Sequence, residues 1–239
     1  MNLTSELVAL VERTEPDPGP DPGTVEITDA YLEEMASSVL AEHDPEDLWV
    51  FAYGSLIWNP EFEVAEQRQA TARGWHRSFC LKLTRWRGTR EVPALMLALD
   101  RGGTCVGMAY RLPPGGNRRQ LLRLLDREVD ANPATNVPRW LTVNAGGEQL
   151  KALAFVASRK GRAYAGRRPL DEVAAVLSRA AGHWGSSAQY AYRTIFMLEE
   201  LGIRDCNLWR IQKLMADKIR SMHQSVGRPS VSEEVRSCR

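Results

Sequence analysis

Apolar and β-branched residues gather in short runs along the first half of the chain, at a spacing typical of strands. The first run covers residues 48–53 and stops at Gly54 and Ser55, where a strand would give way to a turn. The later runs predict strands at 70–83, 93–99 and 105–112. Residues 100–103 contain two consecutive glycines and predict the turn between the last two strands.

Proline and glycine residues end this strand-rich region at 113–116, and a helical pattern begins. Asn117 is a good N-cap, so we expect a helix from there to about residue 130. The pattern then predicts strands at 139–143 and 150–156, followed by helices at 170–181, 187–201 and 208–219. Strands first and helices later indicate an α+β domain.

The two ends of the chain differ from this central region. Residues 1–45 form an extension, and its segment 15–23 is rich in Pro and Asp. We expect an extended linker there, because proline lacks an amide donor and fixes its φ angle, and a short helix after it. Residues 221–239 are polar and predict a flexible tail. The domain is therefore placed at residues 46–220, and whether the extension packs on it is left open.

Composition and charge remove several classes of function. The chain has 31 Lys and Arg residues against 30 Asp and Glu residues, and this balance argues against a nucleic-acid partner. No apolar run approaches the roughly 20 residues that a membrane span requires. The four cysteines show no paired spacing and no metal-ligand pattern. We therefore expect a reducing, cytoplasmic setting and no bound metal. We also expect a monomer or weak homodimer, although none of these features determines the oligomeric state.

The turn at Tyr53, Gly54, Ser55 and Leu56 is the first candidate for chemistry. Glycine lets the backbone approach a ligand closely and tolerates positive φ, and successive amides in such a turn can bind a carboxylate or an oxyanion. A plain strand-to-loop turn would have the same local composition. The segment lacks the Gly-Lys-Ser/Thr ending of a phosphate loop and the second glycine of a nucleophile elbow, which excludes both motifs.

A carboxylate on the apolar face of the helix after Asn117 is the second candidate. Leu121, Leu124, Leu125 and Glu128 follow at i, i+3, i+4 and i+7, so they share one face. A charge on a buried face is costly unless it is paired or neutral. Glu128 is therefore either the partner of a buried cation or a functional acid in a dry cleft.

Eight blocks, in order along residues 48–215, resemble the ChaC family of γ-glutamylcyclotransferases. The blocks are YGSLIWNP followed by FE (53–63), GWHRSFC (74–80), RGT (87–89), LDRGG (99–103), DRE (126–128), PRWL (138–141), YAG (164–166) and LGIRD (201–205). A lone YGSL would be weak evidence, whereas eight blocks in the same order are specific. The extension at the N-terminus has no counterpart that this resemblance places.

The resemblance implies a fold, a reaction and a set of site residues. The fold would be a small mixed β-barrel with flanking helices. The reaction would be the cleavage of glutathione to 5-oxoproline and cysteinylglycine, without a metal, nucleotide or redox cofactor. The turn from Tyr53 to Leu56 would hold the γ-glutamyl group through its backbone amides. Glu128 would be the catalytic carboxylate, and Tyr190 would be a tyrosine near the pocket.

Two departures from the family pattern bear on substrate fit. Asn136 stands where family members usually have Tyr, and Ala94 follows Pro93 where they usually have Gly. Two other interpretations stay open. One is a cyclotransferase for other γ-glutamyl amino acids or amines, and the other is a non-catalytic binding or regulatory protein of the cation-transport regulator type. Formation of product would separate an enzyme from the binding protein.

Overall fold

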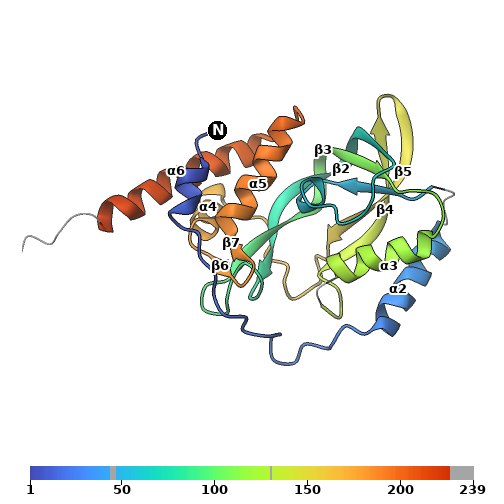
Figure 1. The fold of residues 1–239 in the computed structure, drawn as a ribbon, viewed down its shortest axis with the longest axis horizontal. Helices are drawn as coiled ribbons and strands as arrows, with labels where there is room; N and C mark the ends of the chain where they lie inside the picture. The colour runs from blue at the N-terminus through green and yellow to red at the C-terminus, as the bar shows by residue number, and fades with distance from the viewer. Residues whose placement is uncertain (44–46, 130, 227–239) are drawn as a thin grey trace, which may run out of the picture.

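The central element is a closed five-stranded barrel, seen in a computed structural model that describes residues 1–43, 47–129 and 131–226. Its strands, in the order β1-β3-β2-β4-β5, are antiparallel except that β5 pairs in parallel with β1 and β3. They are β1 (Trp49–Ala52), β2 (Glu66–Leu83), β3 (Ala94–Arg111), β4 (Asn136–Ala145) and β5 (Glu148–Ala157). Helices flank the barrel (Figure 1), which confirms the expected α+β fold with a mixed barrel.

Strands β2 and β3 form one long hairpin of 18 residues each. The turn predicted at residues 100–103 is wrong, because β3 continues through this segment. Gly102 and Gly103 have φ angles of 103° and 73° and lie opposite a shift in register between Arg73 and Trp75 of β2. Two adjacent glycines give the same local signal for a bulge as for a turn, since both use positive φ.

Strand β1 is buried on both faces because it separates two apolar clusters. Trp49 and Phe51 belong to a cluster to which all five barrel strands contribute. Val50 and Ala52 belong to the cluster that the helices cover. Alternate residues of a strand point to opposite faces, so a continuous run of β-formers fits this position. The end of β1 therefore lies where the barrel meets the helices.

Two helices pack against each other on one side of the barrel (Figure 1). Helix α3 (Asn117–Glu128) has Gly116 as its N-cap, so Asn117 is its first residue rather than the expected cap. Helix α2 (Asp29–Glu42) is the short helix expected after the linker, and the Thr28 hydroxyl caps it. Helix α3 ends at a residue of the candidate site, and α2 covers it from outside.

Three further helices gather on another side of the barrel, together with the N-terminal α1 (Ser5–Ala9) (Figure 1). They are α4 (Leu170–Leu177), α5 (Ser187–Glu200) and α6 (Cys206–Val226). Helix α4 ends before residue 181, because the chain there forms a small hairpin of β6 (Ala181–Gly182) and β7 (Gly185–Ser186). Helix α6 continues to Val226, into the segment expected to be a flexible tail, and residues 227–239 lie outside the described part of the chain.

The beginning of the chain packs on these helices. Leu3 is fully buried, and its amide and that of Asn2 each donate to Gln212 Oε1 of α6 at 2.8 Å. The N-terminal extension therefore docks on the domain, while the domain limits at residues 46 and 220 remain a prediction. Over the described residues, none of the helices combines the length and the apolar character that crossing a bilayer requires.

Candidate active site

Strand β1 ends in a turn whose first residue, Tyr53, is hydrogen-bonded through both its side chain and its backbone. The chain passes through Tyr53 and Gly54 into a single 3₁₀ turn, η1 (Ser55–Ile57). The Tyr53 hydroxyl donates to the Phe155 carbonyl of β5 at 2.8 Å. The Tyr53 carbonyl accepts from Nε of Arg77, a residue of β2, at 2.7 Å. These two bonds fix the backbone immediately before the glycine.

The amides of Ser55 and Leu56 begin this turn. The first amide bonded within it is that of Ile57, which donates to the Gly54 carbonyl at 3.0 Å. The two preceding amides therefore have no acceptor inside the turn. Gly54 has a φ of −136°, so the turn does not use the tolerance of glycine for positive φ. Glycine serves here because it has no side chain: a Cβ atom at Gly54 would lie 3.4 Å from the Tyr190 hydroxyl oxygen.

Tyr190 closes the turn from the side of α5. It lies one helical turn after Ser186, the N-cap of α5, and is 6% exposed. Its ring makes edge contacts with the rings of Trp58 and Phe79, with ring centres 6.1 and 6.5 Å apart. The Trp58 indole in turn donates to the Thr194 hydroxyl of α5 at 3.0 Å. The tyrosine implied by the family resemblance thus packs directly beside the turn.

Glu128 is the last residue of α3. The three leucines that share its helix face are buried, whereas the Glu128 side chain is 14% exposed. Its carboxylate accepts hydrogen bonds from Arg127 Nε at 3.1 Å and from Asn136 Nδ2, at the start of β4, at 3.4 Å. The carboxylate therefore lies at the edge of the apolar face, where it is partly accessible.

The hydroxyls of Tyr53 and Tyr190 indicate where that carboxylate lies. Burial raises the pKa of both hydroxyls above the usual value, and in each case the negative charge of Glu128 is the next largest cause. The Coulomb interaction weakens with distance, so Glu128 lies in the vicinity of both hydroxyls. The end of α3 thus lies near the end of β1 and the start of α5.

The two departures from the family pattern have different surroundings. Asn136 contacts Glu128 directly, and within the described chain its Oδ1 atom is buried and has no hydrogen-bond partner. Ala94 packs under the Arg-Gly-Thr loop, where a Cβ atom on Gly88 would lie 2.4 Å from the Ala94 nitrogen. Asn136 is thus a neighbour of the carboxylate, and Ala94 is a neighbour of the loop.

Arg77 contacts the candidate site, and no role was predicted for it from the sequence. It is 4% exposed, donates to the Val106 carbonyl as well as to Tyr53, and pairs with Asp205 at 3.5 Å. It stands two positions before Phe79 in a strand, so alternation places its charge on a face where apolar residues are expected. That misplaced charge is the signal by which Arg77 could have been found.

Arg87 of the Arg-Gly-Thr block is a second such residue. Its guanidinium carbon lies 5.5 Å from the centre of the Tyr190 ring, which is a cation–π contact. Its Nη1 atom donates to the Ser186 carbonyl at 3.1 Å. Burial lowers the pKa of Arg87 from its ordinary value. The loop thus places a partly desolvated cation behind the pocket tyrosine.

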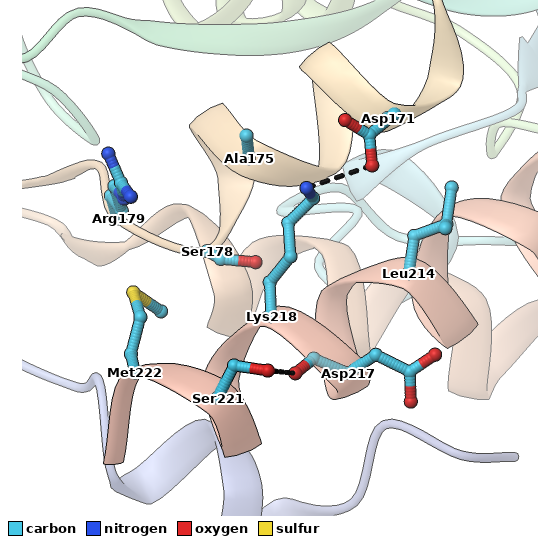
Figure 2. A pocket seen from close by; sticks show the side chains of 9 residues that line it. All are labelled: Asp171, Ala175, Ser178, Arg179, Leu214, Asp217, Lys218, Ser221 and Met222. Carbon is cyan, nitrogen blue, oxygen red and sulfur yellow. Dashed lines mark hydrogen bonds and ion pairs between the residues drawn. The ribbon is translucent and has the colours of Figure 1, made fainter. Parts of the chain in front are cut away.

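A surface cavity of about 400 Å³ lies away from this site, between α4 and α6 (Figure 2). Its lining residues are Asp171, Ala175, Ser178, Arg179, Leu214, Asp217, Lys218, Ser221 and Met222. Figure 2 shows Lys218 extending to Asp171, and the joined Nζ and Oδ1 atoms are 2.8 Å apart. None of the site residues predicted from the sequence lines this cavity.

The family of this chain follows from its similarity to known proteins. Residues 48–218 match the profile of the ChaC-like proteins. The chain belongs to the ChaC-like family. This membership confirms the resemblance that the eight sequence blocks carry. The matched residues of this ChaC-like chain cover the whole barrel and most of the C-terminal helices.

Named relatives and a solved structure agree with this membership. A protein of Escherichia coli (strain K12), named glutathione-specific γ-glutamylcyclotransferase, is 34% identical over 77% of this ChaC-like chain and 80% of its own. Human glutathione-specific γ-glutamylcyclotransferase 1 is 31% identical over 66% of this chain and 73% of its own. A crystal structure of a γ-glutamyl cyclotransferase specific to glutathione from yeast matches with a TM-score of 0.67 and 19% identity. It covers 75% of this chain and 99% of its own, which shows the shared fold.

Proposed function

We propose that this chain is a γ-glutamylcyclotransferase that cleaves glutathione to 5-oxoproline and cysteinylglycine. The observation that carries the proposal is the meeting of a held backbone turn with a carboxylate: the charge of Glu128 acts on both Tyr53 and Tyr190, which flank the turn. The names of the E. coli and human relatives support glutathione as the substrate.

The turn from Tyr53 to Leu56 holds the γ-glutamyl group in this proposal. Backbone amides at the start of η1 donate to anionic oxygen, either the glutamyl carboxylate or the oxyanion that develops during attack. The absence of a Cβ atom at Gly54 lets the turn pack closely beside Tyr190, because an added Cβ would lie 3.4 Å from the Tyr190 hydroxyl oxygen. In this proposal Tyr190 flanks the turn and lies beside the bound γ-glutamyl group.

The reaction is an internal aminolysis. The α-amino nitrogen of the glutamyl unit attacks its own side-chain carbonyl carbon, and the new C–N bond closes a five-membered lactam. The amide bond to cysteinylglycine then breaks, and its nitrogen leaves as an amine. Both reacting groups belong to one molecule, so holding that molecule folded supplies much of the acceleration.

Glu128 acts as the general acid and base. Its carboxylate accepts the proton that the α-amino group loses on attack and returns a proton to the departing amine nitrogen. Arg127 and Asn136 orient the carboxylate through their hydrogen bonds. The 14% exposure of the Glu128 side chain leaves the carboxylate within reach of a bound substrate.

The test is to incubate the purified protein with glutathione, without added metal, and to measure 5-oxoproline and cysteinylglycine. We expect both products in equal amounts. Glu128→Gln should fold normally and lower turnover by about a hundredfold or more, because an amide cannot take the proton. The matched control is Asp126→Asn, which removes an exposed carboxylate from the same helix and should keep wild-type turnover.

Each other result changes a different part of the proposal. Near-normal turnover in Glu128→Gln would remove Glu128 from the mechanism. Cyclisation of another γ-glutamyl amino acid or amine, without turnover of glutathione, would keep the chemistry and change the substrate. No reaction with any γ-glutamyl compound would favour the binding or regulatory protein.

We also propose that the protein works in the cytoplasm as a monomer or weak homodimer. Free thiols at Cys80, Cys105 and Cys206 support a reducing compartment. Size-exclusion chromatography over a range of protein concentrations tests the oligomeric state.

A further inference from the structure

After α1, the N-terminal extension passes the C-terminal helices, and this part includes most of the Pro- and Asp-rich linker. We call residues 12–21 the strap. It runs from α1 past the β6–β7 hairpin, as the blue chain in Figure 1 shows. The Arg13 guanidinium donates to the Arg179 carbonyl at 2.7 Å, and the Glu15 amide donates to the Gly182 carbonyl at 3.2 Å. The strap therefore lies along the connection between α4 and α5.

Glu12, the first residue of the strap, holds the start of α5. Its carboxylate accepts from the Ser186 hydroxyl at 2.5 Å and from the Ser186 amide at 3.2 Å. The same hydroxyl is the N-cap of α5, where it accepts from the Gln189 amide at 3.1 Å. A Cβ atom on Gly185 would lie 2.7 Å from Glu12 Oε1, so the contact leaves no room for a side chain there.

Through Ser186 the strap reaches Arg87 and Tyr190. The Ser186 carbonyl accepts from Arg87, whose guanidinium lies over the Tyr190 ring. The negative charge of Glu12 stabilises the Arg87 cation, against the burial that disfavours it. One strap carboxylate is therefore bonded to the cap of the helix that carries Tyr190, and it also supports the cation that packs on that tyrosine.

The far end of the strap holds the loop that carries Arg87. Asp17 accepts two bonds from Arg85, at 2.8 and 2.6 Å, and Asp21 accepts one from Arg90 at 3.0 Å. The bonded Arg85 guanidinium lowers the pKa of Asp17 to about 2, so this pair stays charged at neutral pH. The strap is thus hydrogen-bonded to the loop on both sides of Arg87.

We propose that Glu12, Asp17 and Asp21 are positioning residues for substrate binding, which set Arg87 and Tyr190 against the glutamyl-binding turn. This inference rests on the proposed function, since it assigns the strap to the same site. It extends the site to a part of the chain that precedes residues 48–218, the region matched to the family.

The exposure of the strap contacts favours a role in binding over a role in folding. The Asp17–Arg85 and Asp21–Arg90 pairs are partly exposed, and such pairs add little to folding stability. The beginning of the chain is anchored separately, through the buried Leu3. Loss of the strap contacts should therefore affect the groups they hold more than it affects the fold.

The experiment measures kcat and KM for glutathione in Glu12→Ala, Glu12→Gln and Glu26→Gln. Glu12→Ala should raise KM by about tenfold, as the loss of one well-placed charged contact does, and keep kcat within about twofold because Glu128 is held by other elements. Glu12→Gln retains an acceptor for the Ser186 amide and should recover part of the KM. Glu26→Gln removes an exposed carboxylate from the same extension and should match wild type in both constants.

A purely structural role gives a different result. Partial unfolding reduces the amount of active enzyme, so it lowers the apparent kcat and leaves KM unchanged, and that outcome would overturn the proposal. If Glu12→Ala does not fold, the double variant Asp17→Asn, Asp21→Asn decides, because its lost contacts are exposed. It should raise KM by about threefold, and an unchanged KM would overturn the proposal as well.

A binding measurement separates this proposal from the proposed function. Titration calorimetry compares glutathione binding to Glu128→Gln with binding to the double variant Glu12→Ala, Glu128→Gln, because both should consume the ligand much more slowly than the wild type does. The dissociation constant should rise by about tenfold in the double variant. Equal constants would overturn the role of the strap alone. Absence of glutathione turnover in the wild type, and of binding in Glu128→Gln, would instead defeat the proposed function, and the strap proposal with it.

Discussion

The two walls of the candidate site differ in how firmly they are held. The turn wall comprises Tyr53–Ile57 with Arg77 and Tyr190 behind it. Every side chain of this wall except that of Ser55 is buried, and both polar ends of Tyr53 are bonded, the hydroxyl to β5 and the carbonyl to Arg77. The bonds come from two different strands, so the turn has little freedom to move.

The carboxylate wall comprises Glu128 with Arg127 and Asn136. It lies at a helix end, and the Glu128 side chain is partly exposed. Its hydrogen bonds from Arg127 and Asn136 measure 3.1 and 3.4 Å, and the buried Oδ1 atom of Asn136 lacks a partner within the described residues. The Asn136 oxygen thus retains hydrogen-bonding capacity that a bound substrate can use.

The difference assigns a separate task to each wall. A group that only binds benefits from being fixed before the substrate arrives, because the ordering then costs nothing at the moment of binding. A group that takes and returns a proton must exchange hydrogen-bond partners as its charge changes. A rigid turn and a partly exposed carboxylate therefore suit a reaction in which one molecule is held folded while a proton moves.

The largest expected effect is a loss of folding stability in Arg77→Met, which removes the side chain that holds the turn wall. The variant leaves the Tyr53 and Val106 carbonyls buried without their donor and Asp205 without its ion-pair partner. We expect a loss of about 3 kcal/mol in the free energy of unfolding, measured by urea denaturation.

Asn136→Ala, on the carboxylate wall, is the comparison for this variant. It should change the free energy of unfolding by no more than about 1 kcal/mol, because it removes a partly exposed side chain. Similar losses in the two variants would show that the walls are held equally firmly, and the contrast between them would be wrong.

The sequence predicted residues of both walls, Tyr53–Leu56 and Tyr190 on one side and Glu128 on the other, but not the contacts that hold them. Helical spacing alone puts Glu128 with three leucines, since residues of one helix face are near neighbours in the chain. The strands of the barrel also follow from local runs of β-formers, and the mixed barrel was implied by the family resemblance.

Contacts between distant segments could not be predicted in this way. The Arg77–Asp205 pair joins residues 128 positions apart, and the Asp17–Arg85 bonds join residues 68 positions apart. The periodicity of a short segment carries no information about such pairs. The bulge at Gly102 and Gly103 shows the same limit, because only the partner strand decides whether two glycines end a strand or bend it.

A smaller effect, confined to binding, is expected from Gly54→Ala. The added Cβ atom would lie 3.4 Å from the Tyr190 hydroxyl oxygen and 3.7 Å from Leu97, so it would occupy the space between turn and tyrosine. We expect KM for glutathione to rise by about tenfold while kcat changes less. An unchanged KM in steady-state kinetics would argue against the turn as the site of γ-glutamyl binding.

The smallest expected effect is on the pH dependence of folding stability, and it comes from the buried hydroxyl of Tyr190 in the turn wall. Burial raises the pKa of the Tyr190 hydroxyl, so the folded state binds this proton more tightly than the unfolded state does. The resulting stability is present below the unfolded pKa of about 10 and is lost as pH rises above it. Tyr190→Phe lacks this titration and should lose about 1 kcal/mol less than wild type between pH 9 and pH 11, measured by urea denaturation. Tyr192→Phe, on the same helix, controls for removal of a hydroxyl, and equal losses in Tyr190→Phe and wild type would mean that water reaches Tyr190 in the folded protein.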